Sequence, residues 1–384
     1  MIYVSHIIES VAQEASGVSY SVPKIVSEVD KTEKMNIELC SIDQSSKLYK
    51  DFDISHKKFD YNNNILAPKK LRGSKLLRRY LTSSQMDVQH YHGLWRPISL
   101  YPKYVKNRNM NSKVVVSPRG MLSDYTFKKN RIAKSVFWTL AQKQALQAAD
   151  CIHVTSKAEF EEVRQRGLTA PIAIIPNGVD LDLKERRKFD DRDNTVLYLG
   201  RIDPKKNLKE LINEWLLVKN NKSWKLIIAG PLDNDYARSL QKIVTDQNCT
   251  NIIFMDGLYG EAKKEAYSRA KIFILPTINE NFGLVVAEAL SHGTPVITTT
   301  GAPWRDLTEY DCGWWIDLDD TSLRETITKV IEIDKRRFEC MSVNAKALAE
   351  TEYGWPEISK KFILLYNWLC FNSTKPDWIH VETL

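Results

Sequence analysis

The chain has 384 residues, of which 43% are hydrophobic and 27% are charged, and its formal net charge is +7. This length is enough for two domains, each with its own core. No apolar run approaches the ~18 residues of a membrane-spanning helix, so a soluble globular protein is expected.

The first ten residues, M-I-Y-V-S-H-I-I-E-S, indicate a first strand. They lack the basic start and the long apolar stretch of a signal peptide. The six cysteines are scattered, without a C-x-x-C pair or metal-ligand spacing, which favours reduced thiols. We therefore expect a cytoplasmic protein without a bound metal.

Strand-like and helix-like segments then alternate along the chain, which predicts a parallel α/β architecture. Four strand-like runs end in a turn or loop: D-V-Q-H-Y-H-G-L-W at 87–95, S-P-R-G-M-L at 117–122, V-L-Y-L-G at 196–200 and L-I-I-A-G-P at 226–231. The last two end at Gly200 and Gly230. A lone histidine on an apolar strand is usually a hydrogen-bonded core residue, and we place His90 in that class.

The loop after Gly200 reads R-I-D-P-K-K-N and carries Arg201, Lys205 and Lys206. An arginine fork and a lysine point charge in one loop suit a diphosphate, whose departure requires fixed positive charge. Without further features, a solvated basic turn would be the simpler interpretation.

The most informative segment is E-N-F-G-L-V-V-A-E, which runs from Glu280 to Glu288. Residues 272–275 before it indicate a buried strand, and residues 284–290 have helical spacing. The segment from Glu280 to Gly283 therefore lies where unpaired backbone N–H groups and the positive helix end face a ligand. Glu288, a little over two turns further on, can stay on the same side.

With P-T-x-x-E-x-F-G before it and A-L-S-H-G-T-P-V-I after it, this segment resembles the E-x7-E motif of the retaining glycosyltransferases of family 4. Other pieces follow in the family's order over nearly the whole chain, including P-N-G-V-D at 176–180. The resemblance implies the GT-B fold: two Rossmann-like domains with parallel sheets that face each other across a cleft. It implies domains at 1–178 and 179–354, with residues 355–384 crossing back onto the first domain as a helix and tail.

The resemblance also implies the roles of individual residues. Arg201 and Lys206 would clamp the diphosphate, with Lys205 as a possible substitute, and would replace a metal ion. Glu280 would hold donor-sugar hydroxyls and Glu288 the ribose hydroxyls. The remaining donor contacts would come from Gly17, Gly200, Gly230, Asn281, Phe282, Gly283 and Leu284.

In the N-terminal half, His92 is by position the histidine that faces the reacting sugar. Arg119 replaces the histidine that is commoner in the family, and Ser16-Gly17 supplies one of the two glycines usual after the first strand. These two departures leave the roles of both positions open.

Positive charge is concentrated in the N-terminal half. Residues 1–178 contain 27 Lys and Arg against 16 Asp and Glu, a net of +11, and the remainder of the chain has a net of −4. Two basic stretches with interleaved apolar residues, at 69–81 and 128–138, read as helices that anionic membranes would attract by ~1 kcal/mol per basic residue. Ordinary solvated helix faces are an equal alternative, and nucleic-acid binding is disfavoured because no binding motif accompanies the charge.

The resulting prediction is a retaining, metal-independent glycosyltransferase that uses a UDP- or GDP-linked hexose. Its acceptor would be a glycan, polyprenyl-diphosphate-linked, in O-antigen or capsule synthesis at the inner face of the cytoplasmic membrane. Two alternatives remain: a UDP-sugar 2-epimerase of the same fold, and a non-catalytic subunit of a polysaccharide assembly complex.

Overall fold

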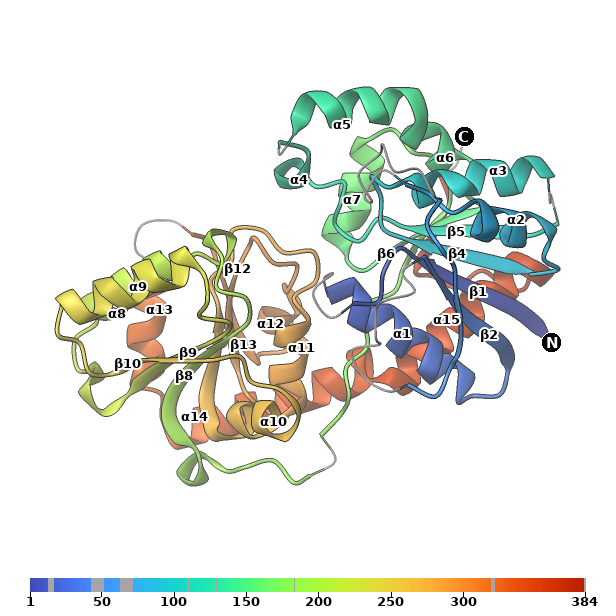
Figure 1. Ribbon diagram of the computed structural model, residues 1–384. Helices are drawn as coiled ribbons and strands as arrows, with labels where there is room; N and C mark the ends of the chain where they lie inside the picture. Colours follow the sequence, from blue (N-terminus) through green and yellow to red (C-terminus); the bar gives the residue numbers. More distant parts are fainter. Residues whose placement is uncertain are drawn as a thin grey trace. The chain divides into compact units, whose positions relative to one another are not determined.

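The computed structural model describes residues 1–12, 17–42, 52–62, 72–108, 111–128, 130–182, 184–318 and 322–382. These residues form two compact units, one made of Met1–Gly178 with Trp355–Leu384 and one made of Val179–Gly354. Each unit contains one sheet of mainly parallel strands with helices on both faces (Figure 1).

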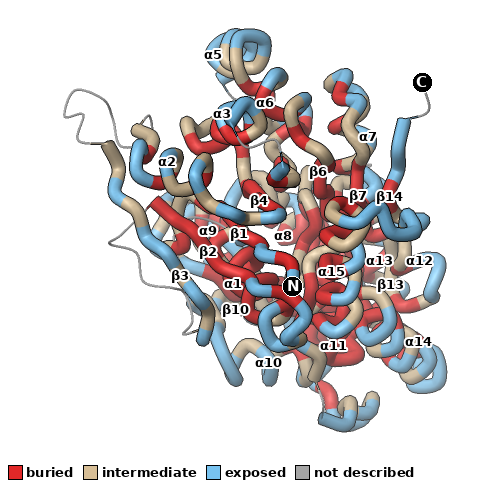
Figure 2. Tube along the Cα trace, turned by 90° about the vertical axis from the view of Figure 1, so that its right-hand side faces the viewer, coloured by how far each residue is buried: buried red, intermediate tan, exposed pale blue. Residues whose placement is uncertain are grey.

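The sheet of the first unit has the order β14-β7-β6-β5-β4-β1-β2-β3, and only β14 is antiparallel. Its interior strands are almost completely buried, as parallel strands covered on both faces must be (Figure 2). The strands are β1 (Ile2–Ile8), β2 (Met35–Ser41), β3 (Ser55–Lys58), β4 (Val88–His92), β5 (Lys113–Ser117), β6 (Cys151–Val154), β7 (Ile172–Ile174) and β14 (Ile379–His380).

Two apolar layers enclose this sheet. On one face, α1 (Gly17–Asp30) and α15 (Trp355–Phe371) pack on residues such as Val4 and Val115. On the other face the core includes Tyr91 and Val116. The helices on that side are α2 (Lys75–Ser83), α3 (Tyr101–Arg108), α6 (Lys143–Gln147) and α7 (Lys157–Gln165).

The helix α15 belongs to the first unit although it comes after the whole second unit in the sequence. Its apolar residues, among them Ile358, Phe362 and Tyr366, are buried in the layer that also contains α1. This helix lies within the segment 355–384, which the resemblance assigns to a helix and tail, and it runs from Trp355 to Phe371.

The basic stretches 69–81 and 128–138 are not the continuous helices that we expected. In the first, α2 begins only at Lys75, because Ser74 caps it by accepting from the backbone N–H of Leu77 at 3.1 Å. In the second, Asn130 adopts a left-handed conformation with φ +63°. This separates α4 (Asp124–Lys128) from α5 (Arg131–Phe137). Lys69, Lys70 and Lys129 lie outside the described residues.

The second unit has a six-stranded parallel sheet of order β10-β9-β8-β11-β12-β13 around its own core. Its strands are β8 (Asp193–Leu199), β9 (Lys225–Ala229), β10 (Ile252–Met255), β11 (Ala270–Leu275), β12 (Val296–Thr299) and β13 (Gly313–Ile316). The helices are α8 (Leu208–Leu217), α9 (Asp235–Asp246), α10 (Gly260–Arg269), α11 (Leu284–Ser291), α12 (Asp306–Glu309), α13 (Ser322–Ile331) and α14 (Lys335–Leu348). The order reverses at β8 and β11, and in open α/β sheets ligands bind at the carboxyl ends of strands beside such a switch point.

Among the described residues, no helix combines the length and the apolarity that crossing a bilayer requires.

Candidate functional site

The carboxyl edge of the second sheet brings together the residues that the sequence singled out. Gly200 and Arg201 follow β8, and Gly230 follows β9. A Cβ on Gly230 would lie 2.0 Å from the carbonyl oxygen of Gly200, so only glycine allows the two strand ends to approach this closely.

Lys206 and Glu280 form an ion pair across this edge, although 74 positions separate them in the sequence. Lys206 ends a short 3-10 turn after β8, and Glu280 lies in the loop after β11. One backbone bond joins the two loops, since Ile278 N–H donates to the carbonyl of Lys205 at 2.9 Å; a second, from Glu280 N–H to the carbonyl of Gly301 at 2.7 Å, ties the Glu280 loop to the loop after β12. The pairing is therefore built into the backbone.

Glu280 is ionised in this environment. Burial opposes its ionisation, but the charge of Lys206 and the hydrogen bond from it hold the pKa of Glu280 below its ordinary value. At Lys205, burial lowers the pKa and Glu280 partly offsets the effect. Arg201 is exposed, and none of the described residues accepts a hydrogen bond from its guanidinium. The edge thus offers a paired lysine, a partly buried lysine and an uncommitted arginine to an anion.

The start of α11 faces the same edge. Gly283 caps the helix in the left-handed conformation with φ +78°, which a side chain would strain. The buried Phe282 packs on Trp304, whose indole N–H donates to the carbonyl of Phe282. Asn281 and Leu284 flank this anchored turn. Sequence reasoning missed Trp304, which holds the turn from a distant loop.

Glu288 lies on α11 with both carboxylate oxygens engaged by α10. Lys263 Nζ is 2.7 Å from one oxygen, and the hydroxyl of Tyr267 donates to the other at 2.9 Å. A carboxylate fixed this way has lone pairs left for a ligand hydroxyl. Neither Lys263 nor Tyr267 belongs to a recognisable motif, and only the fold places α10 beside α11.

In the first unit, His92 is buried rather than open to a ligand. Its Nε2 lies 2.9 Å from Nδ1 of His6, and its Nδ1 lies 3.2 Å from Nη2 of Arg119. Both ring nitrogens therefore face protein groups. Gly17 begins α1, and the preceding Ser16 lies outside the described residues.

His92 belongs to a row of buried polar groups at the ends of neighbouring strands. The row consists of His6, His90, His92, Ser117 and His153, and Tyr366 of α15 covers it. Burial is the main cause that lowers the pKa of all four histidines, in the case of His6 to about 3, and the charge of Arg119 contributes to each. They are therefore neutral at physiological pH.

Three of these rings have the spacing of a metal site, since ring nitrogens of His6, His90 and His92 lie within 4.8 Å of one another. A cation fits this group poorly, because the nitrogens already bond to one another, to Tyr366 and to Ser117. The guanidinium of Arg119 beside them would also repel it.

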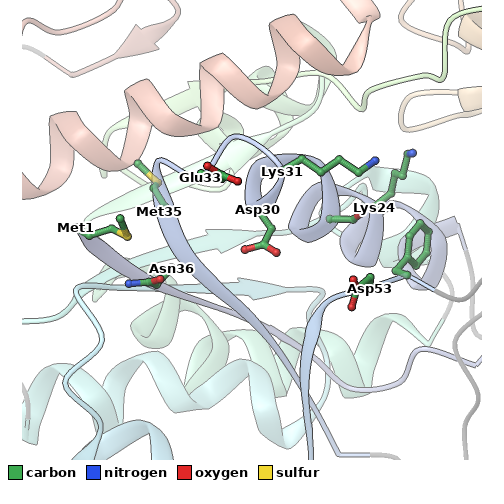
Figure 3. Close-up of a pocket in the computed structure, with 10 residues that line it drawn as sticks. Met1, Lys24, Asp30, Lys31, Glu33, Met35, Asn36 and Asp53 are labelled. Atoms are coloured by element: carbon green, nitrogen blue, oxygen red, sulfur yellow. The ribbon is translucent and has the colours of Figure 1, made fainter.

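One hollow on the first unit is not part of this edge. It has a volume of about 630 Å³ and lies at the amino ends of β1 and β2, where Met1, Met35 and Asn36 line it (Figure 3). Its charges have both signs, and its lysines, Lys24 and Lys31, both pair with Glu28 at 2.7 Å. Such a lining selects no particular ligand.

Comparison with known proteins agrees with this geometry. The sequence model of the family described as Glycosyl transferases group 1 matches residues 180–347, and that of Glycosyltransferase Family 4 matches residues 41–183. Each model covers less than half of the chain, together they span residues 41–347, and both describe glycosyltransferases, which is the class that this chain resembles.

Curated relatives are distant and matched over varying lengths. An uncharacterised glycosyltransferase of Methanocaldococcus jannaschii is 24% identical over 51% of this chain and 53% of its own length. The phosphatidyl-myo-inositol mannosyltransferase of Mycobacterium leprae is 23% identical over 78% of both chains. The O-antigen chain mannosyltransferase RfbU of Salmonella typhimurium is 31% identical over 33% of this chain and 35% of its own. The chain thus spans only about half of the first of these and a third of the last.

Solved structures cover almost the whole chain and share its fold. Sucrose-phosphate synthase from Thermosynechococcus elongatus aligns over 97% of this chain and 100% of its own, with a TM-score of 0.72 and 17% identity. Anabaena HepE, solved with UDP and glucose, aligns over 94% and 98%, with a TM-score of 0.70 and 15% identity. The prediction of two Rossmann-like domains in the GT-B fold is confirmed.

Proposed function

We propose that this protein transfers a hexose from a nucleotide-diphosphate sugar to a glycan acceptor, with retention of the anomeric configuration. The observation that carries the proposal is the Lys206–Glu280 pair beside Arg201 and the start of α11. Cations and backbone N–H groups aimed at one point are what a departing diphosphate requires.

The pair has a function in both states of the site. Without donor, Glu280 keeps Lys206 in place. When the diphosphate arrives, Lys206 and Arg201 bind its oxygens, and the ionised Glu280 accepts hydrogen bonds from donor-sugar hydroxyls. Glu288, held by Lys263 and Tyr267, accepts from the ribose hydroxyls.

Retention follows from attack on the face that the diphosphate leaves. The acceptor oxygen forms a bond to the anomeric carbon as the bond from that carbon to the diphosphate oxygen breaks, and the acceptor proton passes to the leaving phosphate. Arg201 and Lys206 stabilise the negative charge that develops, a task that a metal ion performs in other sites. No covalent intermediate with a carboxylate is assigned, and the resemblance to family 4 supports this route.

We place the acceptor on a membrane surface, as a lipid-linked glycan of bacterial surface polysaccharide. The similarity to RfbU supports this class of acceptor. A hollow of about 400 Å³ on the first unit, between α2 and α3, adds support, because Lys75, Arg78, Arg79 and Arg108 line it with no carboxylate.

An apolar stripe lies on the same side of the first sheet. Ile132, Val136 and Leu140, spaced four residues apart along α5 and the following turn, are 82%, 53% and 71% exposed. Contacts between α2 and α3, and between α3 and α6, connect the helices of this layer (Figure 1). A face that carries both basic side chains and exposed apolar ones is typical of a surface that binds anionic lipid.

The experiment that tests donor binding is a thermal-shift screen of UDP, GDP, ADP and CMP with their common sugar conjugates. One diphosphate should raise the melting temperature of the wild type and fail to do so with Arg201→Ala. Arg238→Ala is the matched control, because Arg238 pairs locally with Asp235 on the same unit. Absence of any shift at millimolar nucleotide would overturn the proposal.

Product analysis then separates the enzyme classes. A transferase releases nucleotide only with acceptor, an epimerase converts the nucleotide sugar alone, and an assembly subunit binds nucleotide without turnover.

A further inference from the structure

Among the residues that the structure describes, two arginines are buried, and they differ in how their N–H donors are used. Arg192 has all five N–H groups bonded: to the carbonyls of Arg187, Ala270, His292 and Gly293 and to the hydroxyl of Thr294. Its role is structural, since the guanidinium ties loops of the second unit together.

Arg119 is buried to a similar degree, at 8% exposed, yet only three of its five N–H groups have a partner. Nε and Nη2 share Nδ1 of His92 at 3.4 and 3.2 Å, and Nη1 donates to Oδ1 of Asn177 at 2.8 Å. One N–H remains on each terminal nitrogen. No carboxylate of the described chain lies within ion-pair distance; Glu159 acts on Arg119 only through its charge.

Arg119 carries its charge at neutral pH. Burial lowers its pKa to about 10, which is still well above physiological pH. A buried cation without an anionic partner is costly, and proteins keep one mainly where a ligand completes it. Its two unused N–H groups on a planar fork match two oxygens of one phosphate.

The neighbouring histidine row fixes the orientation of Arg119. At the end of the row far from Arg119, the carbonyl oxygen of Ile175 can only accept a hydrogen bond. Nε2 of His153, 2.9 Å away, therefore carries the hydrogen, and Nδ1 of His153 accepts from the hydroxyl of Ser117. It follows that Ser117 accepts from Nε2 of His90.

The same logic continues to the arginine. Nδ1 of His90 accepts from the hydroxyl of Tyr366, which accepts from Nε2 of His6. Nδ1 of His6 then accepts from Nε2 of His92, and Nδ1 of His92 is left to accept from Arg119. Every hydrogen bond in the row thus runs in one direction, from the guanidinium to Ile175.

We infer that Arg119 is an anion-binding residue that holds a phosphate group of the acceptor at the carboxyl edge of the first sheet. The site lies where β4 and β5 end, at the edge where ligands of parallel sheets bind. His92 positions Arg119 and does not touch the sugar. The assignment to the acceptor rests on the proposed function, because a lipid-diphosphate-linked glycan carries the required group.

The test is calorimetric binding of inorganic pyrophosphate to the full chain with the donor site disabled by Arg201→Ala and Lys206→Ala. Binding should persist in this background and weaken about tenfold or more when Arg119→Gln is added, because two charge-assisted hydrogen bonds are lost. Arg119→Lys, which keeps the charge and lacks the fork, should bind with intermediate affinity. Equal binding with and without Arg119 would overturn the inference.

Two further measurements keep the result interpretable. Arg119→Gln alone must still bind the nucleotide through the second unit, which shows that the chain is folded; should it unfold, Arg119→Lys decides the question. Farnesyl diphosphate should bind more tightly than pyrophosphate if the ligand is lipid-linked. Equal affinities of the two compounds would overturn the assignment to a lipid-linked acceptor. Arg119-dependent binding in a protein that binds no nucleotide would support this site while rejecting the transferase.

Discussion

At the scale of single residues, Lys206 and Glu280 form a mostly buried ion pair in the proposed donor site. Each side chain is mostly buried, with 12% and 19% of its surface exposed. A carboxylate and an ammonium in such a place stabilise each other, and removal of one leaves the other uncompensated. The pair is a structural contact, and under the proposed function it also supplies the charges that the reaction uses.

We predict that Lys206→Ala lowers turnover by about 10² to 10³-fold, because one cation that stabilises the leaving diphosphate is lost. Glu280→Ala should lower it by orders of magnitude as well. Steady-state kinetics with the donor found by thermal shift would measure both effects, with Lys222→Ala, an exposed lysine of the same unit, as the control.

The melting temperature distinguishes the structural role of the pair from its proposed role in the reaction. Lys206→Ala should lower the melting temperature more than the double variant Lys206→Ala/Glu280→Ala does, because the double variant leaves no unpaired carboxylate. Neither the single nor the double variant should have wild-type turnover, because both lack Lys206. Complete unfolding of the single variants would mean that the pair is structural and not part of the donor site.

At the scale of elements, α5 is the helix whose sequence and surroundings disagree most. One side carries Phe137, which packs near Trp95. The other side exposes Ile132 and Val136, although a helix on a solvated surface normally presents polar groups there. The basic hollow between α2 and α3 supplies the charge that would accompany insertion of this stripe into a lipid headgroup layer.

We predict that Arg78→Gln/Arg79→Gln reduces binding to vesicles containing phosphatidylglycerol by roughly 30-fold, since each basic residue contributes ~1 kcal/mol. Ile132→Ser/Leu140→Ser should reduce it further at high salt, where charge is screened. Vesicle co-sedimentation measures both, and Lys222→Gln/Lys242→Gln on the second unit is the charge-matched control. Equal binding of all variants would show that this surface does not contact membranes.

At the scale of the whole molecule, both units have their candidate functional residues at the carboxyl edge of a parallel sheet. In the second unit the edge is lined with charge, and in the first it is lined with neutral histidines that end at one guanidinium. These neutral histidines lower the free energy of unfolding at acid pH, because they are protonated in the unfolded state and not in the folded state.

We predict that the free energy of unfolding of the first unit falls as pH is lowered below 6.5. The pKa values of His6, His90, His92 and His153 are depressed in the folded state, so the unfolded state binds more protons between pH 6.5 and their folded values. Each contributes up to about 1.4 kcal/mol per pH unit, so the four together approach about 5 kcal/mol per unit.

Urea unfolding between pH 7.5 and 5 would measure this slope, because paired carboxylates such as Glu280, with a lowered pKa, lose their contribution only at lower pH. His153→Asn should make the slope shallower. A free energy of unfolding that stays constant across this pH range would contradict the prediction that the four histidines are neutral in the folded state.

Sequence reasoning reached much of the architecture because the relevant signals are local. The strand before Glu280 and the helix after it are encoded in one short segment, residues 272–290, and β11 and α11 were found where expected. The two basic helices were placed less well, because a Ser74 cap and a left-handed Asn130 decide their ends, and charge composition does not encode either.

What the sequence by itself determined is the alternation of strands and helices and with it the parallel α/β class, since both follow from short-range periodicity; the two-domain arrangement and the candidate site residues came from the resemblance to family 4. Only the tertiary structure decided which of those residues meet: Lys206 with Glu280, Lys263 with Glu288, and Arg119 with His92. The physical reason is that strand order fixes these neighbours across tens of residues. It also buried His92, which the resemblance to family 4 places at the sugar, and left Arg119 with two uncommitted donors.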